Sequence, residues 1–141
     1  MGRVRLRLVG LALLLILAAC GGDASGSPTT FRTVSPSEAA EIIGEGRPDL
    51  VVLDLRTPEE FNAGHLPGAV NLDFSDPAFA AGLAALDRQA PYVLYCWTGM
   101  MSADVREMMR DLGFVEVYEI EGGIVAWVEA GGPLDGYSPG L

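Results

Sequence analysis

The sequence predicts an α/β domain with a mainly parallel central sheet of about five strands and helices on both faces. Short apolar runs alternate along the chain with segments whose apolar residues recur at helical spacing, and brief turns separate them. The run at residues 50–53 is continuously apolar, as expected for a strand buried on both faces. Ligands bind beyond the carboxyl ends of the strands in such sheets, so functional residues are expected at that edge.

A strand at residues 31–34 is expected to lead into the first helix. Ser35 is a typical N-cap, Pro36 suits the first helical position, and Glu38 stands where it would complete a capping box. The helix is expected to end within the Gly- and Pro-containing stretch at residues 44–48.

The same capping pattern recurs after the strand at residues 50–53. Thr57 with Glu60 predicts a short helix that ends at Ala63. A Gly- and Pro-rich turn at residues 64–68 then precedes a short strand at residues 69–72.

Three further helices and two strands are expected in the second half of the chain. Asp76-Pro77 opens one helix, and a second begins at Ser102 after a strand at residues 92–95. A strand at residues 115–120 and a last short helix follow, and the tail from Gly131 is expected to fray. The inward-facing residues expected on the three helices are Phe79, Leu83 and Leu86; Val105, Met108, Met109 and Leu112; and Ile124, Trp127 and Val128.

The N-terminus has the features of an export signal. Three arginines precede an apolar run at residues 8–19, which is shorter than the roughly 20 residues that a membrane-spanning helix needs. The run ends in Leu-Ala-Ala-Cys-Gly, which resembles the lipobox of bacterial lipoproteins, in which the cysteine, here Cys20, is lipidated. A plain signal peptide followed by an incidental cysteine is the alternative. We therefore expect an exported, membrane-anchored lipoprotein that faces the periplasm or the cell exterior.

Charge and cysteine content narrow the function further. The chain has no lysine, and cleavage before Cys20 would lower its formal net charge from −10 to −13, which argues against nucleic acid as a partner. With Cys20 assigned to the lipid, Cys96 is the one remaining thiol and His65 the one histidine, so no Cys/His zinc site can be assembled. No metal and no cofactor are expected.

Cys96 stands where a predicted strand ends and just before a predicted helix. Backbone N–H groups without partners converge at a helix N-terminus and carry partial positive charge, so the thiolate is favoured over the thiol there. Cys96 is therefore a candidate nucleophile. The alternative is an inert thiol that is buried for packing alone.

Four stretches carry a family pattern, in order along the chain: VVLDLR with PEEF, GHLPGAVN, YC with its loop and Ser102, and EGG through Trp127 to Gly131. Together they resemble a single-domain rhodanese, a sulfurtransferase-like protein. The resemblance implies a three-layer rhodanese-like fold over residues 31–134. We expect residues 1–19 to be a cleaved signal peptide, residues 20–30 a flexible lipid-anchored linker, and residues 135–141 a C-terminal tail.

The resemblance also implies a mechanism. Cys96 would take sulfur from a small donor such as thiosulfate or a persulfide, hold it as an enzyme persulfide, and pass it to a thiol or cyanide-type acceptor. The expected substrate-binding loop, whose N–H groups would stabilise the sulfur, consists of Trp97, Thr98, Gly99, Met100, Met101 and Ser102. Asp54 and Arg56 would act as a supporting ion pair, with Glu60 a further candidate member, and His65 would have a structural role.

The loop departs from the family pattern on its substrate side. Family members that use thiosulfate often carry Arg or Lys where this chain has Trp97 and Met101, and Arg106 could replace them only if it reached back. A donor less anionic than thiosulfate, such as a thiol persulfide, is therefore expected. Cysteine phosphatases need an arginine where this chain has Ser102, so that activity is not expected.

Two hypotheses other than catalysis remain open. One is a catalytically weak rhodanese module that docks a partner protein through its apolar loop, for which Met100 and Met101 are the rim candidates. The other is a redox element that forms a mixed disulfide through Cys96.

Overall fold

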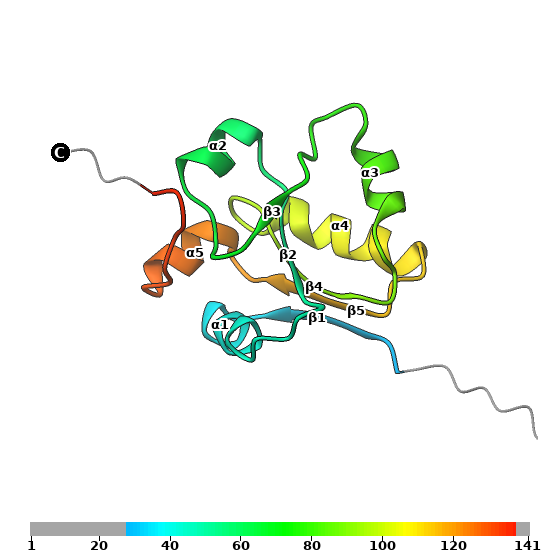
Figure 1. The fold of residues 1–141 in the computed structure, drawn as a ribbon, viewed down its shortest axis with the longest axis horizontal. Coiled ribbons are helices and arrows are strands. Elements are labelled where there is room, and N and C mark those ends of the chain that lie inside the picture. Colours follow the sequence, from blue (N-terminus) through cyan, green and yellow to red (C-terminus); the bar gives the residue numbers. More distant parts are fainter. Residues whose placement is uncertain (1–27, 138–141) are drawn as a thin grey trace, which may run out of the picture.

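The computed structural model describes residues 28–137, which form one sheet of five parallel strands. The strand order is β1-β5-β4-β2-β3, which places β4 at the centre (Figure 1). The predicted sheet of about five mainly parallel strands is confirmed. The strands are β1 (Thr30–Val34), β2 (Val51–Asp54), β3 (Val70–Asn71), β4 (Pro91–Tyr95) and β5 (Glu116–Ile120).

Helices cover both faces of the sheet, as the three-layer prediction requires (Figure 1). One core cluster joins α3 and α4 to the sheet, and the other joins α1 and α5 to its opposite face. Phe61 of α2 packs against the second cluster. The helices are α1 (Pro36–Gly44), α2 (Pro58–Ala63), α3 (Phe79–Ala85), α4 (Met100–Asp111) and α5 (Gly123–Glu129).

The central strand β4 divides its side chains between the two cores. Tyr92 and Leu94 belong to the core under α3 and α4, whereas Val93 and Tyr95 belong to the core under α1 and α5. This alternation follows from the two-residue period of a strand. Cys96 continues the series and lies on the α4 side.

Two helices begin at other residues than predicted. α4 begins at Met100, two residues before Ser102, because Gly99 adopts a left-handed conformation (φ 91°) and turns the chain into the helix early. α3 begins at Phe79 instead of at Asp76-Pro77. The carboxylate of Asp76 accepts a hydrogen bond from the backbone N–H of Ala78 at 2.7 Å, which holds that stretch in a turn.

Three apolar residues assigned to helix inner faces are in fact exposed. Met108 is 42% exposed, Leu112 36% and Val128 49%, while Val105, Met109, Ile124 and Trp127 are buried. Met108 and Val128 each adjoin a buried apolar residue, and because adjacent helical residues lie about 100° apart, only one of each pair can point directly into the core. Leu112 is the C-cap residue, at the end of α4.

The caps are confirmed with one exception. Ser35 Oγ accepts the N–H of Glu38 at 3.2 Å, and Thr57 and Glu60 form a complete capping box. The carboxylate of Glu38 instead forms an ion pair with Arg32 of β1, so the predicted capping box of α1 is not completed.

The C-terminal segment is attached to the body of the domain. Asp135 pairs with His65 through two backbone hydrogen bonds of 2.8 and 3.0 Å, and its carboxylate accepts the N–H of Gly68. The Trp127 indole N–H donates to the carbonyl of Pro133. The expectation of fraying from Gly131 onward is therefore wrong for residues 133–135.

The predicted signal peptide and most of the predicted linker lie outside the described residues. Within residues 28–137, none of the helices has the length and apolar character needed to cross a membrane.

Candidate active site around Cys96

Cys96 directly follows the central strand β4 and is 2% exposed. Its Sγ accepts a hydrogen bond from the backbone N–H of Gly99 at 3.2 Å. Its carbonyl accepts the N–H of Ile124 at the start of α5 at 2.9 Å. The cysteine is thus fixed between the first turns of two helices, with an N–H donor directed at its sulfur.

Gly99 makes this turn possible. A Cβ at this position would lie 3.0 Å from the backbone nitrogen of Gly122, and the positive φ adds strain for any other residue. Because α4 starts at the next residue, its unpartnered N-terminal N–H groups lie next to the cysteine loop. The early start of α4 brings its positive end closer to Cys96 than the sequence suggested.

Ser102 lies inside the fold, under the loop. It is fully buried, and its hydroxyl lies 2.9 Å from Glu119 Oε1 and 3.1 Å from the Gly99 carbonyl oxygen. Glu119 comes from β5 and is itself 2% exposed. Glu119 was not among the site residues predicted from the sequence. The one sequence feature that could have indicated it is an acidic residue within a strand of otherwise alternating polar and apolar residues.

The remaining loop residues divide between surface and core. Trp97 is 53% exposed and Met100 79% exposed, and Thr98 is also exposed. Met101 packs against the core cluster under α4. Met100 and Met101 were both rim candidates, and only Met100 lies fully at the surface.

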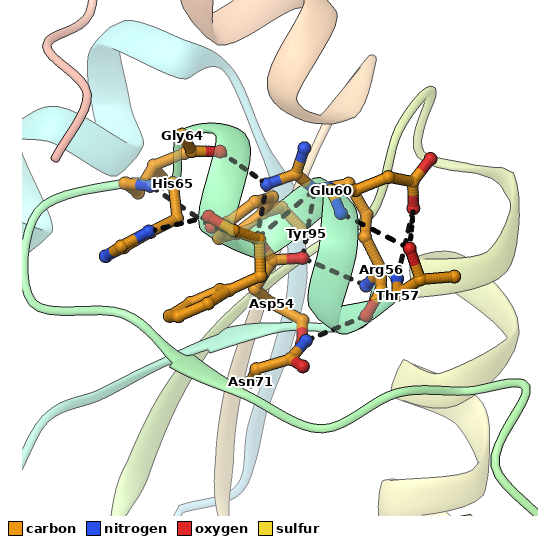
Figure 2. Close-up of polar contacts among 10 residues, drawn as sticks. Asp54, Arg56, Thr57, Glu60, Gly64, His65, Asn71 and Tyr95 are labelled. Atoms are coloured by element: carbon orange, nitrogen blue, oxygen red, sulfur yellow. Dashed lines mark hydrogen bonds and ion pairs between the residues drawn. The ribbon is translucent and has the colours of Figure 1, made fainter. Parts of the chain in front are cut away.

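Asp54 and Arg56 form a buried ion pair at the end of β2, next to the central strand (Figure 2). Asp54 accepts from the Arg56 backbone N–H, from its Nε and Nη2, and from the Tyr95 hydroxyl at 2.5 Å. Arg56 Nη2 also donates to the Gly64 carbonyl at 2.7 Å. The predicted ion pair is confirmed, whereas Glu60 serves the Thr57 cap instead.

This pair also shifts two pKa values. Burial opposes the charge of Arg56, but the hydrogen bonds and the charge of Asp54 outweigh that effect and raise the pKa of Arg56. Burial and the hydrogen bond to Asp54 raise the pKa of Tyr95 above its ordinary value, so the hydroxyl keeps its proton.

Arg56 connects this ion pair to the cysteine loop. Its guanidinium carbon lies 5.7 Å from the centroid of the Trp97 ring and equally far from that of Tyr95. One terminal nitrogen carries no contact in Figure 2 and points away from Asp54. Arg56 therefore stabilises the position of Trp97 through a cation–π contact.

Arg106 does not reach back to the loop. Its guanidinium bonds Glu107 and Thr33, and its Nη1 lies 3.9 Å from Glu119 Oε2. The side chain thus points toward β1 and β5 and supplies no cation to the cysteine.

His65 has structural contacts. Its Nδ1 lies 2.9 Å from the Phe61 carbonyl oxygen, and its ring stacks on that of Phe61 at 3.9 Å between centroids. Across residues 28–137 no group of three or more His, Cys, Asp or Glu side chains could hold a metal ion.

A pocket of about 440 Å³ opens next to the cysteine loop, between α2, α5 and the C-terminal segment. No pattern in the sequence indicates this pocket, because its walls come from four separate stretches of the chain. Its main lining residues are Arg56, Trp97, Val125, Val128, Leu134 and Tyr137.

Comparisons with known proteins agree with this architecture. The sequence model of the Rhodanese-like domain matches residues 35–130. The thiosulfate sulfurtransferase GlpE of Shewanella oneidensis is 38% identical over 79 residues, which cover 56% of this chain and 76% of GlpE. The probable adenylyltransferase/sulfurtransferase MoeZ of Mycobacterium tuberculosis is 33% identical over 112 residues, or 78% of this chain; the match spans 28% of MoeZ.

Solved structures show the same fold. A rhodanese-related protein from Thermoplasma volcanium superposes with a TM-score of 0.66 at 28% identity, covering 75% of this chain and 99% of that one. The Alr3790 protein from Anabaena superposes with a TM-score of 0.63 at 26% identity, covering 73% and 82%. With a matching family model over most of the chain, the described fold and the sulfurtransferase relatives, the chain belongs to the rhodanese-like family.

Proposed function

We propose that this protein is an exported, lipid-anchored sulfurtransferase that carries sulfane sulfur as a persulfide on Cys96. The observation that supports it best is the N–H of Gly99, which donates to Cys96 Sγ at 3.2 Å beside the N-terminus of α4. Such donors stabilise negative charge on sulfur, whether on a thiolate or on the terminal atom of a persulfide.

The reaction has two steps. In the first, the Cys96 thiolate attacks the outer sulfur of the donor, so a new S–S bond forms, the donor's S–S bond breaks, and the leaving group takes the electron pair. That leaving group is sulfite from thiosulfate or a thiolate from a persulfide. In the second, an acceptor thiolate or cyanide attacks the outer sulfur, and Cys96 leaves as a thiolate.

The charges around Cys96 favour a persulfide donor over thiosulfate. The loop itself carries no cation, and Arg106 is directed toward Glu107 and Thr33. A doubly charged anion would lack the charge-assisted hydrogen bonds that an Arg or Lys provides.

Intact-mass measurement tests the persulfide. The purified protein is treated with glutathione persulfide or thiosulfate, and we expect a gain of one sulfur atom that cyanide or excess thiol removes. Cys96→Ser should abolish the gain, whereas the matched variant Cys20→Ser should keep it. Absence of a sulfur gain from either donor at high excess would overturn the proposal.

The lipid anchor has a separate test with the same two variants. In a bacterial host given a traceable fatty acid, label should enter the wild-type protein and Cys96→Ser and be absent from Cys20→Ser. Label in Cys20→Ser, or none in the wild type, would contradict anchoring at Cys20.

The exposed loop residues favour a second candidate function, a module that binds a partner protein. Trp97 and Met100 are 53% and 79% exposed beside a cysteine that is itself almost inaccessible. A stable complex that survives Cys96→Ser, together with no sulfur gain, would support this candidate. A glutathione adduct without sulfur transfer would instead indicate a mixed-disulfide redox role.

A further inference from the structure

The pocket beside Trp97 has a size and a lining that suit a small organic molecule. Its volume is about 440 Å³, within the range of small-molecule sites, and its lining is mostly apolar. Val125 and Val128 of α5 form one wall, and Leu134 and Tyr137 of the C-terminal segment form another. These residues come from elements that hydrogen bonds hold together, since Trp127 of α5 bonds Pro133 and Asp135 bonds His65.

The pocket adjoins the loop that follows Cys96, and Cys96 itself is not among its lining residues. Trp97, the residue after Cys96, lines it. The N–H of Ile124 donates to the Cys96 carbonyl at 2.9 Å, and that of Val125 donates to the Trp97 carbonyl at 3.3 Å. The first turn of α5 therefore belongs to both the pocket and the cysteine loop.

The pocket lining carries one guanidinium and two carboxylates, so its formal net charge is negative. Its one cation, Arg56, is bound bidentately by the buried carboxylate of Asp54. Glu60 and Glu129 add two carboxylates to the lining; that of Glu60 accepts the Thr57 N–H, and Glu129 is exposed. A ligand with a carboxylate or sulfonate would be repelled, whereas a neutral or cationic apolar one would be accepted.

We infer that this pocket binds the apolar body of the sulfur acceptor, a small thiol with an aromatic or branched aliphatic group and no negative charge outside its sulfur. The inference rests on the proposed sulfur transfer at Cys96 and adds the acceptor's chemical class. The acceptor thiolate attacks the outer sulfur of the Cys96 persulfide and leaves as a new persulfide. The pocket holds its carbon skeleton against Trp97 and α5 during that step.

Acceptor competition tests the inference. The protein is first loaded with one sulfur atom, as checked by intact mass, and is then discharged by 2-phenylethanethiol, 3-mercaptopropionate or cyanide. We expect 2-phenylethanethiol to discharge it about tenfold or more faster per molar thiolate than 3-mercaptopropionate, because only the former gains contacts in an apolar pocket. Equal rates for the two thiols would overturn the inference and leave the persulfide itself intact.

A matched pair of variants locates the effect. Val128 and Val70 are both 49% exposed, but only Val128 lines the pocket. Val128→Glu should lower the rate ratio of 2-phenylethanethiol to cyanide about tenfold, whereas Val70→Glu should leave the ratio unchanged. A similar ratio in both variants would overturn the assignment to this pocket.

Binding of a ligand that cannot react distinguishes the proposed acceptor pocket from the proposed sulfur transfer at Cys96. 2-Phenylethanol has the same carbon body without a thiol, and Trp97, which is 53% exposed, reports its binding by fluorescence. The inference is supported if the quenching saturates, if Val128→Glu weakens it and Val70→Glu does not, and if sulfur loading remains normal. Quenching with no sulfur gain at Cys96 would overturn the proposed function and, with it, the acceptor role of the pocket.

Discussion

Replacing Tyr95 with phenylalanine should destabilise the protein far more than the same change at Tyr92. Both tyrosines lie on β4 and are at most 1% exposed, so each substitution removes one oxygen atom from a buried side chain; the hydrogen bond of the Tyr95 hydroxyl is buried and that of the Tyr92 hydroxyl is part-buried. The Tyr95 hydroxyl donates to the Asp54 carboxylate at 2.5 Å and accepts the Leu66 N–H at 3.1 Å. The Tyr92 hydroxyl makes one hydrogen bond, of 2.9 Å, to a turn carbonyl.

The magnitudes follow from these partners. Tyr95→Phe removes a hydrogen bond to a charged acceptor and leaves a buried N–H without its partner, for a loss of about 3 kcal/mol. Tyr92→Phe removes one neutral hydrogen bond, for a loss of about 1 kcal/mol. In a domain of this size, the melting temperature should fall by roughly 12 °C for Tyr95→Phe and about 4 °C for Tyr92→Phe.

Denaturant unfolding at pH 7 measures both losses, since both tyrosines carry their protons there. Equal losses for the two variants, or a smaller loss for Tyr95→Phe, would refute the argument that the Asp54 contact stabilises this edge of the sheet. Sulfur loading of Tyr95→Phe should fall only as far as its fraction of folded protein falls. That result would show that Tyr95 affects loading through the stability of the fold alone.

The pH dependence provides a second readout of Tyr95. Its pKa is raised in the folded protein, so above about pH 10 the unfolded chain binds fewer protons than the folded one. The contribution of Tyr95 to stability is therefore fully present below about pH 10 and declines by about 1.4 kcal/mol per pH unit above it. The decline should be shallower by that amount in Tyr95→Phe, because phenylalanine does not titrate.

Two further substitutions test other contacts. Gly123→Ala should lower the free energy of unfolding by about 3 kcal/mol and impair sulfur loading, because the φ of Gly123 is 60° and a Cβ there would lie 2.5 Å from the Cys96 carbonyl oxygen. The control variant is Gly113→Ala, at a φ of 84° with nothing within 4 Å of the added Cβ. It should lower the free energy of unfolding by about 1 kcal/mol in the same assay. The hydrogen bond from Arg47 lowers the pKa of the Glu116 carboxylate. The stability that this pair contributes is therefore present above about pH 4.5 and is lost as the pH falls below it. Arg47→Gln should lower the free energy of unfolding by about 1 kcal/mol at pH 7, and the stability of this variant should fall less steeply with decreasing pH than that of the wild type. An unchanged slope at acid pH would contradict the interaction between Arg47 and Glu116.

The parts of the fold predicted from sequence are those that local chemistry determines. Ser35 and Thr57 accept N–H groups three residues away, so their roles as caps depend on adjacent sequence alone. The apolar run of β4 and the position of Cys96 at its end also follow from a short stretch of chain. The pairing of Asp54 with Arg56 joins residues two apart and was predicted for the same reason.

The parts that sequence could not predict depend on contacts between distant segments. Glu38 could have closed a capping box, but Arg32 of the neighbouring strand provides a charged partner instead. Glu119 is buried and accepts a hydrogen bond from Ser102 of α4, 17 residues away, a separation that no local pattern encodes. The pocket likewise requires α2, α5 and the C-terminal segment to meet.

The cations near Cys96 bear on which sulfur compounds the proposed transfer would use. Arg56 is paired with Asp54, and Arg106 is paired with Glu107 and lies near Glu119, so each is neutralised by carboxylates. In the proposed mechanism, negative charge on sulfur would then be stabilised by the Gly99 N–H and the N-terminus of α4. Those groups suit a single charge at the sulfur atom itself and offer nothing to a second charge farther along the molecule. Under the proposed transfer, we therefore expect discrimination between sulfur compounds to depend on the carbon skeleton, and the apolar pocket beside Trp97 is the surface proposed to contact it.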